Sequence, residues 1–105
     1  MWFAASLLFR SSHVPTDTRP AIWEESVRII EAETESEALK EAERIGAFAI
    51  HTYETERGLV IWTFEKVERV YSIQDEELRS GSEVFSRFLR DAEVQSLLEP
   101  FEDES

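Results

Sequence analysis

The stretch WFAASLLFR, residues 2–10, decides the fold. Its apolar side chains lie on both faces of an extended chain, as in a strand that is covered on both sides within a sheet. We therefore predict a central strand here. One face carries Trp2, Ala4 and Leu8, and the opposite face carries Phe3, Ala5, Leu7 and Phe9.

The segments after this strand indicate a loop and then a second strand. SSHVPTDTRP, residues 11–20, contains two prolines and small polar residues and predicts a loop. IWEESVRIIEAE, residues 22–33, alternates in polarity and is rich in β-branched residues, which favours a strand.

A helix follows, because Thr34 and Glu37 have the spacing of a capping box. In such a box the threonine hydroxyl accepts a backbone N–H while the glutamate reaches back toward the start of the helix. Apolar residues then recur at helical spacing. They are Ala38, Leu39, Ala42, Ile45 and Ala49, and Gly46 marks either the end of the helix or a late kink.

Two more strands are predicted at residues 49–55 and 59–73, and Gly58 between them indicates a hairpin. The second of these strands is long enough to predict a bend or a bulge. Strict alternation along it predicts that Val60, Trp62 and Phe64 share one face, whereas Leu59, Ile61 and Val67 share the other.

Together these elements predict an α+β domain over residues 1–90, with a mainly antiparallel four-stranded sheet in β-β-α-β-β order. One helix covers one face, and a C-terminal helical segment follows. The other face needs a cover, and the two candidates are the C-terminal segment and a second copy of the chain. The second candidate predicts a homodimer.

GSEVFSRFL, residues 81–89, reads as the start of a helix. Ser80 and Glu83 match a second capping box, so we predict a helix beginning near Gly81. Arg87 points away from its apolar face, and Glu83 is its possible partner four residues earlier.

Charge narrows the choice of partners. The net charge is −12, and the segment 91–105 holds six acids and no lysine or arginine. This acidic tail is expected to be partly helical or disordered. It is either a solvating end or a surface that docks on a basic protein, and binding to nucleic acid is disfavoured. We expect no membrane association and a cytoplasmic location, because no apolar run is long enough for a membrane helix and cysteine is absent.

Four blocks in this order resemble a bacterial family described as domain of unknown function 4288: MWFAASLLF, EESVRIIEAETESEALKEAE, GLVIWTFEKV and GSEVFSRFL. The resemblance covers residues 2–89 and leaves out the acidic tail. It implies no activity, cofactor or catalytic residue. The first loop of this chain is short and contains prolines, where relatives have longer acidic inserts.

Two functional hypotheses follow. We favour a non-enzymatic interaction module that forms a homodimer or masks a basic protein, with Trp62 and Tyr53 as aromatic contacts. The alternative is a small-ligand-binding domain or enzyme with a pocket between the sheet and the C-terminal helix, using His51, Tyr53 and Arg87. We predict no catalytic residue, no metal site and no cofactor, because neither histidine has a partner at metal-ligand spacing.

Overall fold

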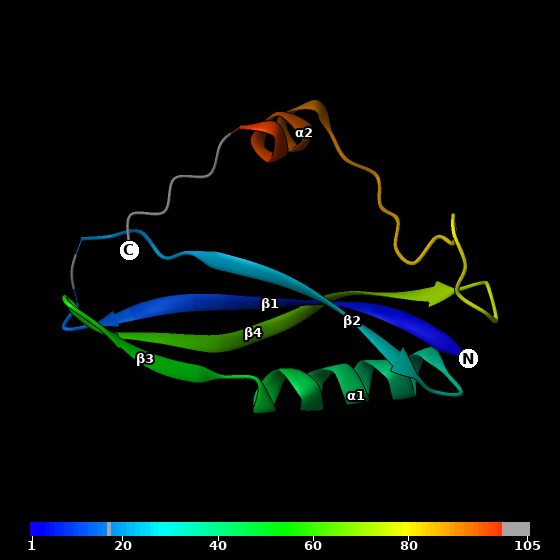
Figure 1. Ribbon diagram of the computed structural model, residues 1–105, viewed down its shortest axis with the longest axis horizontal. Coiled ribbons are helices and arrows are strands. Elements are labelled where there is room, and N and C mark those ends of the chain that lie inside the picture. The colour runs from blue at the N-terminus through cyan, green and yellow to red at the C-terminus, as the bar shows by residue number, and fades with distance from the viewer. Residues whose placement is uncertain (17, 100–105) are drawn as a thin grey trace.

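A computed structural model describes residues 1–16 and 18–99 of the chain, and Figure 1 shows the arrangement of its strands and helices. The elements follow in the predicted order. They are β1 (Trp2–Val14), β2 (Trp23–Glu31), α1 (Glu35–Phe48), β3 (His51–Thr55), β4 (Gly58–Ile73) and α2 (Asp91–Leu98). The prediction of an α+β fold is confirmed.

The four strands form one antiparallel sheet in the order β2-β1-β4-β3, so β1 is central as predicted. The hairpin at Gly58 is also confirmed, since β3 pairs with β4 directly across it. The predicted loop at residues 11–20 is wrong in its first part, because β1 continues to Val14, which pairs with Leu59. Its small polar residues are in the strand because β4 is long enough to supply backbone hydrogen bonds to them.

The main core lies between the sheet and α1, below the sheet in Figure 1. The odd-numbered side chains of β1 from Phe3 to Phe9 are buried there against Ala38 and Ala42 of the helix. Alanines on the contact stripe let the helix lie close to the large side chains of the strand.

The predicted irregularity in β4 is confirmed as two register shifts opposite β1, where the pairing skips Glu65 and Glu68. The first shift moves Val67 to the face of Phe64, and both side chains pack against the α1 core. The prediction that Val67 lies on the other face is therefore wrong. An extra residue in one strand reverses the alternation beyond it, which a strict period of two cannot anticipate.

The start of α1 has the predicted cap. Thr34 Oγ1 accepts the backbone N–H of Glu37 at 3.2 Å, and Glu37 Oε2 accepts the N–H of Glu33 at 3.3 Å. Gly46 does not end the helix, because α1 continues to Phe48. Its role is close packing: a Cβ added at Gly46 would lie 2.5 Å from two ring carbons of Phe64.

The helix predicted near Gly81 is wrong. Residues 82–90 contain no helix, and α2 begins only at Asp91. Gly81 has a φ of 93°, and Ser82 forms a turn instead: its Oγ accepts the N–H of Arg79 and donates to Asp75. Because the carboxylate of Glu83 binds Tyr71, it does not cap a helix.

We predict that Gly46→Ala destabilises the protein by about 1–2 kcal/mol. Overpacking against Phe64 costs about 1–3 kcal/mol, which exceeds the gain of about 1 kcal/mol that alanine brings to a helix interior. Denaturant unfolding measures the difference. In a Phe64→Leu background the same substitution should become neutral or stabilising, and a stabilising effect in the wild-type background would contradict this packing role.

Candidate functional site: the C-terminal arm and its sheet face

The segment from Gln74 to Leu98, which we call the C-terminal arm, leaves β4 and passes over the sheet on the side opposite α1 (Figure 1). We call that side of the sheet the arm face. It presents the even-numbered residues of β1 and their partners on the neighbouring strands, among them Trp23, Val27 and Ile29 of β2. The predicted second cover of the sheet is thus, in part, the C-terminal segment.

Arg87 links the arm to the edge strand β2 through an ion pair with Glu25. Its Nη1 donates to Glu25 Oε2 at 3.2 Å, and the same oxygen accepts the hydroxyl of Ser6 at 2.5 Å. Ser6 is fully buried in the central strand. The side chains of Arg87 and Glu25 are 29% and 33% exposed, so water screens this pair less than an open surface pair.

Glu83 fastens the arm to β4. Its carboxylate accepts the hydroxyl of Tyr71, and the ring of Tyr71 lies 6.0 Å from the ring of Phe85. The hydrogen bond to Glu83 is the main cause that raises the pKa of the Tyr71 phenol, and desolvation and the negative charge of Glu83 add to it. Glu83 and Arg87 are therefore not bonded to each other as the spacing predicted, since an extended segment separates residues that a helix would bring together.

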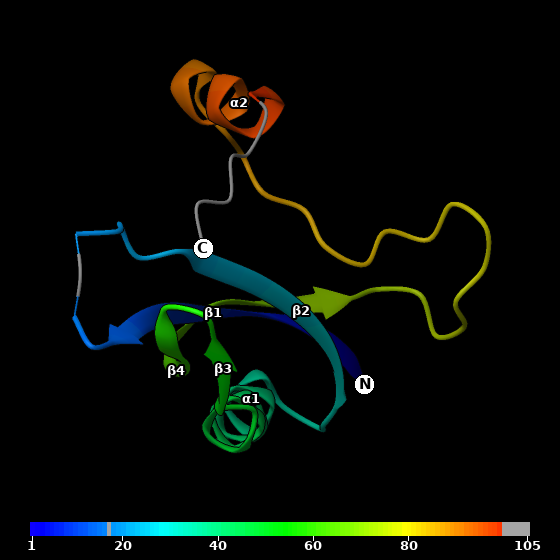
Figure 2. The same cartoon turned by 60° about the vertical axis from the view of Figure 1, so that its left-hand side comes forward.

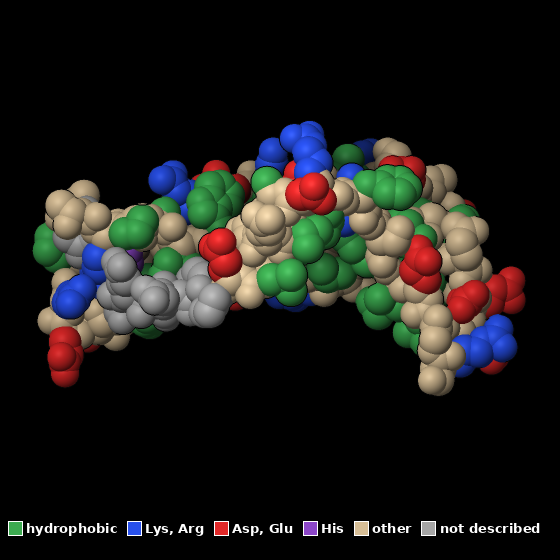
Figure 3. All heavy atoms as spheres, turned by 90° about the horizontal axis from the view of Figure 1, so that it is seen from above, with side chains coloured by type: hydrophobic (Ala, Val, Ile, Leu, Met, Phe, Trp, Pro, Cys, Tyr) green, Lys and Arg blue, Asp and Glu red, His purple; other side chains and the backbone are tan. Residues whose placement is uncertain are grey.

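Beyond these two anchors the arm leaves apolar side chains in solvent. Phe88 is fully exposed, and Leu97 and Leu98 of α2 are mostly exposed. Among the described elements α2 packs against no other, and Figure 2 shows it standing clear of the sheet. Trp23, Val27 and Ile29 on the arm face are also about half exposed, and Figure 3, viewed from this side, shows apolar surface among the charges.

The other three predicted site residues form a separate group. The imidazole of His51 stacks at 6.1 Å from the Tyr53 ring and at 6.4 Å from the indole of Trp62. Trp62 packs against the α1 core, so this aromatic row lies on the α1 side of the sheet, at the β3 edge. Arg87 contacts β2 at the opposite edge, and the structure therefore does not bring His51 and Tyr53 together with it.

Sequence reasoning missed Ser6, Glu25 and Tyr71 as the residues that hold the arm. Ser6 carried a usable signal, because a lone hydroxyl inside the apolar stretch 2–9 needs a hydrogen-bond partner when it is buried. Its partner could not be read from the sequence, because Glu25 is brought beside it only by the pairing of β1 with β2.

The described part of the chain can be compared with the patterns of a metal site and of a membrane-spanning helix. Over residues 1–16 and 18–99 no three acidic or histidine side chains gather as metal ligands would. In the same ranges neither α1 nor α2 has the length and apolar character that a bilayer-spanning helix requires.

The fold and this site define an acidic α+β domain whose antiparallel sheet is covered by a helix on one face and crossed by a C-terminal arm on the other. The chain belongs to the family described as domain of unknown function (DUF4288), whose model matches residues 2–86. The match ends within the arm, before α2. Comparison with curated proteins and with solved structures gave no match.

We predict a coupling free energy of about 0.5–1 kcal/mol between Arg87 and Glu25. It is measured from the unfolding of Arg87→Ala, Glu25→Ala and the double variant. The coupling should weaken with added salt. The exposed pair Arg44–Glu41 on α1 is the matched control and should couple less strongly. Equal coupling in the two pairs would show that the arm is not anchored here.

We also predict that Glu83→Ala lowers the pKa of Tyr71, because the variant removes the acceptor that stabilises the neutral phenol. Absorbance titration in a Tyr53→Phe background isolates this group, and Glu76→Ala serves as the control on the same arm. A pKa raised in the folded state stabilises the protein below the unfolded pKa. That contribution is lost as the pH rises through the folded pKa. If the Tyr71 titration is unchanged in Glu83→Ala, the contact between Glu83 and Tyr71 is contradicted.

Proposed function

We propose that this domain is a non-enzymatic protein-interaction module that binds a basic protein through α2 and the arm face. The observation that carries the proposal is the exposure of Leu97 and Leu98 on a helix that packs against no other described element. Apolar side chains grouped on an element without a tertiary contact are typical of a surface that a partner covers.

The length of α2 supports the same conclusion. It has eight residues, whereas isolated helices shorter than about 12–15 residues are marginal in water. Its N-cap residue Arg90 makes no side-chain capping hydrogen bond, and the 3.7 Å ion pair of Arg90 with Glu93 is exposed, so local interactions add little. A partner that receives the apolar side of α2 would supply the packing that the helix otherwise lacks.

Charge selects the kind of partner. Asp91, Glu93 and Glu99 lie on or beside α2, and the chain as a whole carries −12. A basic protein would be attracted by this field, whereas a second copy of the chain carries the same charge and would be repelled. We therefore favour a basic protein over the homodimer, and we place the interaction in the cytoplasm, where a chain without cysteine is at no disadvantage.

The alternative function, ligand binding between the sheet and the C-terminal helix with His51, Tyr53 and Arg87, has less support. Those residues lie at opposite edges of the sheet.

In the test, the whole wild-type protein and the variant Leu97→Ser/Leu98→Ser are immobilised separately and compared. We expect the wild type to retain a basic protein at low salt and to release it at high salt, and the variant to retain at least tenfold less. Unfolding of the two proteins should coincide, because both leucines are mostly exposed. Leu78→Ser, at another exposed apolar position of the arm, is the matched control and should retain the partner.

Light scattering at micromolar concentration distinguishes a basic partner protein from a second copy of the chain as the molecule that covers α2. A mass of 12.2 kDa for the free chain supports a heterologous partner. Twice that mass, lost in the leucine variant, would overturn the proposal in favour of a second copy. Equal retention of the basic protein by wild type and variant would also overturn it.

A further inference from the structure

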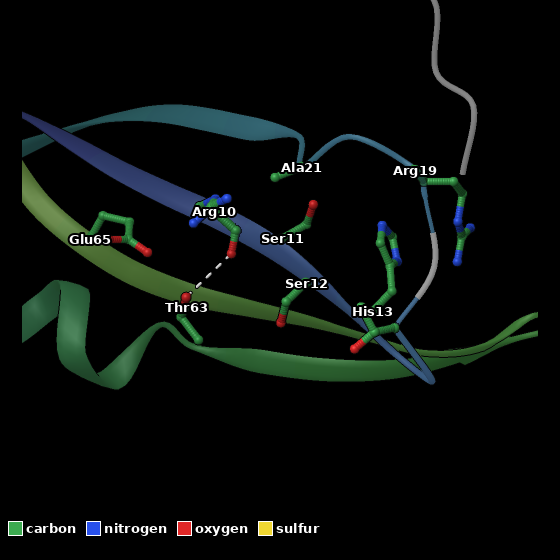
Figure 4. Close-up of a pocket in the computed structure, with 9 residues that line it drawn as sticks. Arg10, Ser11, Ser12, His13, Arg19, Ala21, Thr63 and Glu65 are labelled. Carbon is green, nitrogen blue, oxygen red and sulfur yellow. Dashed lines mark hydrogen bonds between the residues drawn. The ribbon is translucent and has the colours of Figure 1, made fainter.

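A cavity of about 280 Å³ opens at the end of β1 beyond Phe9, at the opposite end of the sheet from Ile73, where the arm leaves β4. Arg10 and His13 of β1 and Arg19 of the following loop contribute basic side chains to it, and Ser11, Thr16 and Thr63 contribute hydroxyls. Figure 4 shows His13 and Arg19 toward one end of the lining and Arg10 and Glu65 toward the other.

This gathering of cations is unusual for the chain. The protein has 11 lysines and arginines against 23 acids, yet among the described residues the cavity lining combines two arginines and a histidine with one acid, Glu65. Two guanidinium groups near hydroxyl donors form a typical environment for a phosphate group, because arginine presents a planar fork of N–H donors to oxyanions.

Several of these groups are held in place before any ligand arrives. The guanidinium carbon of Arg10 lies 5.7 Å from the centre of the Trp23 ring, as in a cation–π contact. Ser11 joins the far end of the loop to β1: its N–H donates to Ile22 O at 2.9 Å, and its Oγ accepts the Ile22 N–H at 2.8 Å. The hydroxyl proton of Ser11 is not used in either bond.

One atom of the cavity wall lacks a partner. Nδ1 of His13 is buried and makes no hydrogen bond within the described residues. This atom has almost no accessible surface, so a ligand in the cavity contacts other parts of the His13 ring and not Nδ1. The hydroxyl of Thr63 already donates to the backbone oxygen of Arg10 at 3.4 Å (Figure 4).

We infer that this cavity binds a phosphate group, either as the free ion or as the monoester of a small molecule, between Arg10, His13 and Arg19. The volume lies just below the usual range of about 300–1,000 Å³ for ligand pockets, which restricts the ligand to a small one. Glu65 opposes the anion, so binding is selective for a ligand that engages both arginines. The inference does not depend on the proposed protein partner.

The test is a titration of the isotope-labelled whole protein, followed by amide chemical shifts. The probes are inorganic phosphate, glycerol phosphate and, as the control ion, chloride at equal ionic strength. We expect both phosphates to shift the amides of residues 10–13 and 19–22, with a dissociation constant on the order of 1 mM or tighter. Tighter binding of the monoester would identify an organic phosphate as the ligand, and tighter binding of the ion would identify free phosphate.

Arg19→Gln should weaken phosphate binding at least tenfold, because it removes a charge-assisted contact. Arg28→Gln on β2 changes the net charge equally outside the cavity and should change binding less than twofold. Far-ultraviolet circular dichroism confirms that both variants fold, and if Arg19→Gln unfolds, Arg10→Gln replaces it. The inference fails if phosphate shifts none of these amides, if chloride shifts them equally, or if Arg28→Gln weakens binding as much as Arg19→Gln.

Discussion

The rest of this structure depends on the burial of the central strand on both of its faces. Phe3, Ala5 and Leu7 point to one side and Ala4 and Ser6 to the other, and all five are essentially inaccessible to solvent. A sheet with such a strand at its centre needs a cover on each side. α1 supplies the first cover through apolar packing, whereas the C-terminal arm supplies the second through hydrogen bonds that begin at Ser6 and Glu25.

The two covers of the sheet differ in the kind of contact that they make with it. Apolar contacts across the α1 side form a continuous core, which includes Phe9 and Phe64 at a ring distance of 5.7 Å. The arm has anchors at Arg87 and Glu83 but leaves Phe88 and most of α2 in solvent. One face of the sheet is therefore sealed by apolar packing, and the other leaves apolar side chains exposed, which the proposed partner would cover.

Much of the fold could be predicted from local patterns, because those patterns report forces that act within a few residues. The capping box at Thr34 and the turn at Gly58 are local signals of this kind, and each led to the correct element. The shifts at Glu65 and Glu68 arise from pairing with a strand far away in sequence, so alternation alone misplaced Val67. The helix predicted near Gly81 failed for a similar reason, since Asp75 and Tyr71 compete for the groups that would have capped it.

The candidate site shows the same limit. The sequence singled out His51, Tyr53 and Trp62, and their rings lie together because the residues stand on paired strands joined by a short hairpin. Arg87 was identified, but its partner Glu25 lies on β2, and only the tertiary fold brings the two together. The cavity near His13 was missed altogether, because its walls come from a strand end, a loop and β4.

The pairing of β1 with β4 also has a consequence for synthesis on the ribosome. β1 emerges before the other described elements, whereas the strand that completes its hydrogen bonding begins only at Gly58. At usual rates of elongation the interval lasts on the order of seconds. During that time the apolar stretch of residues 2–9 has only β2 and then α1 as native partners, so the nascent chain passes through a state with an open sheet edge at its most apolar strand.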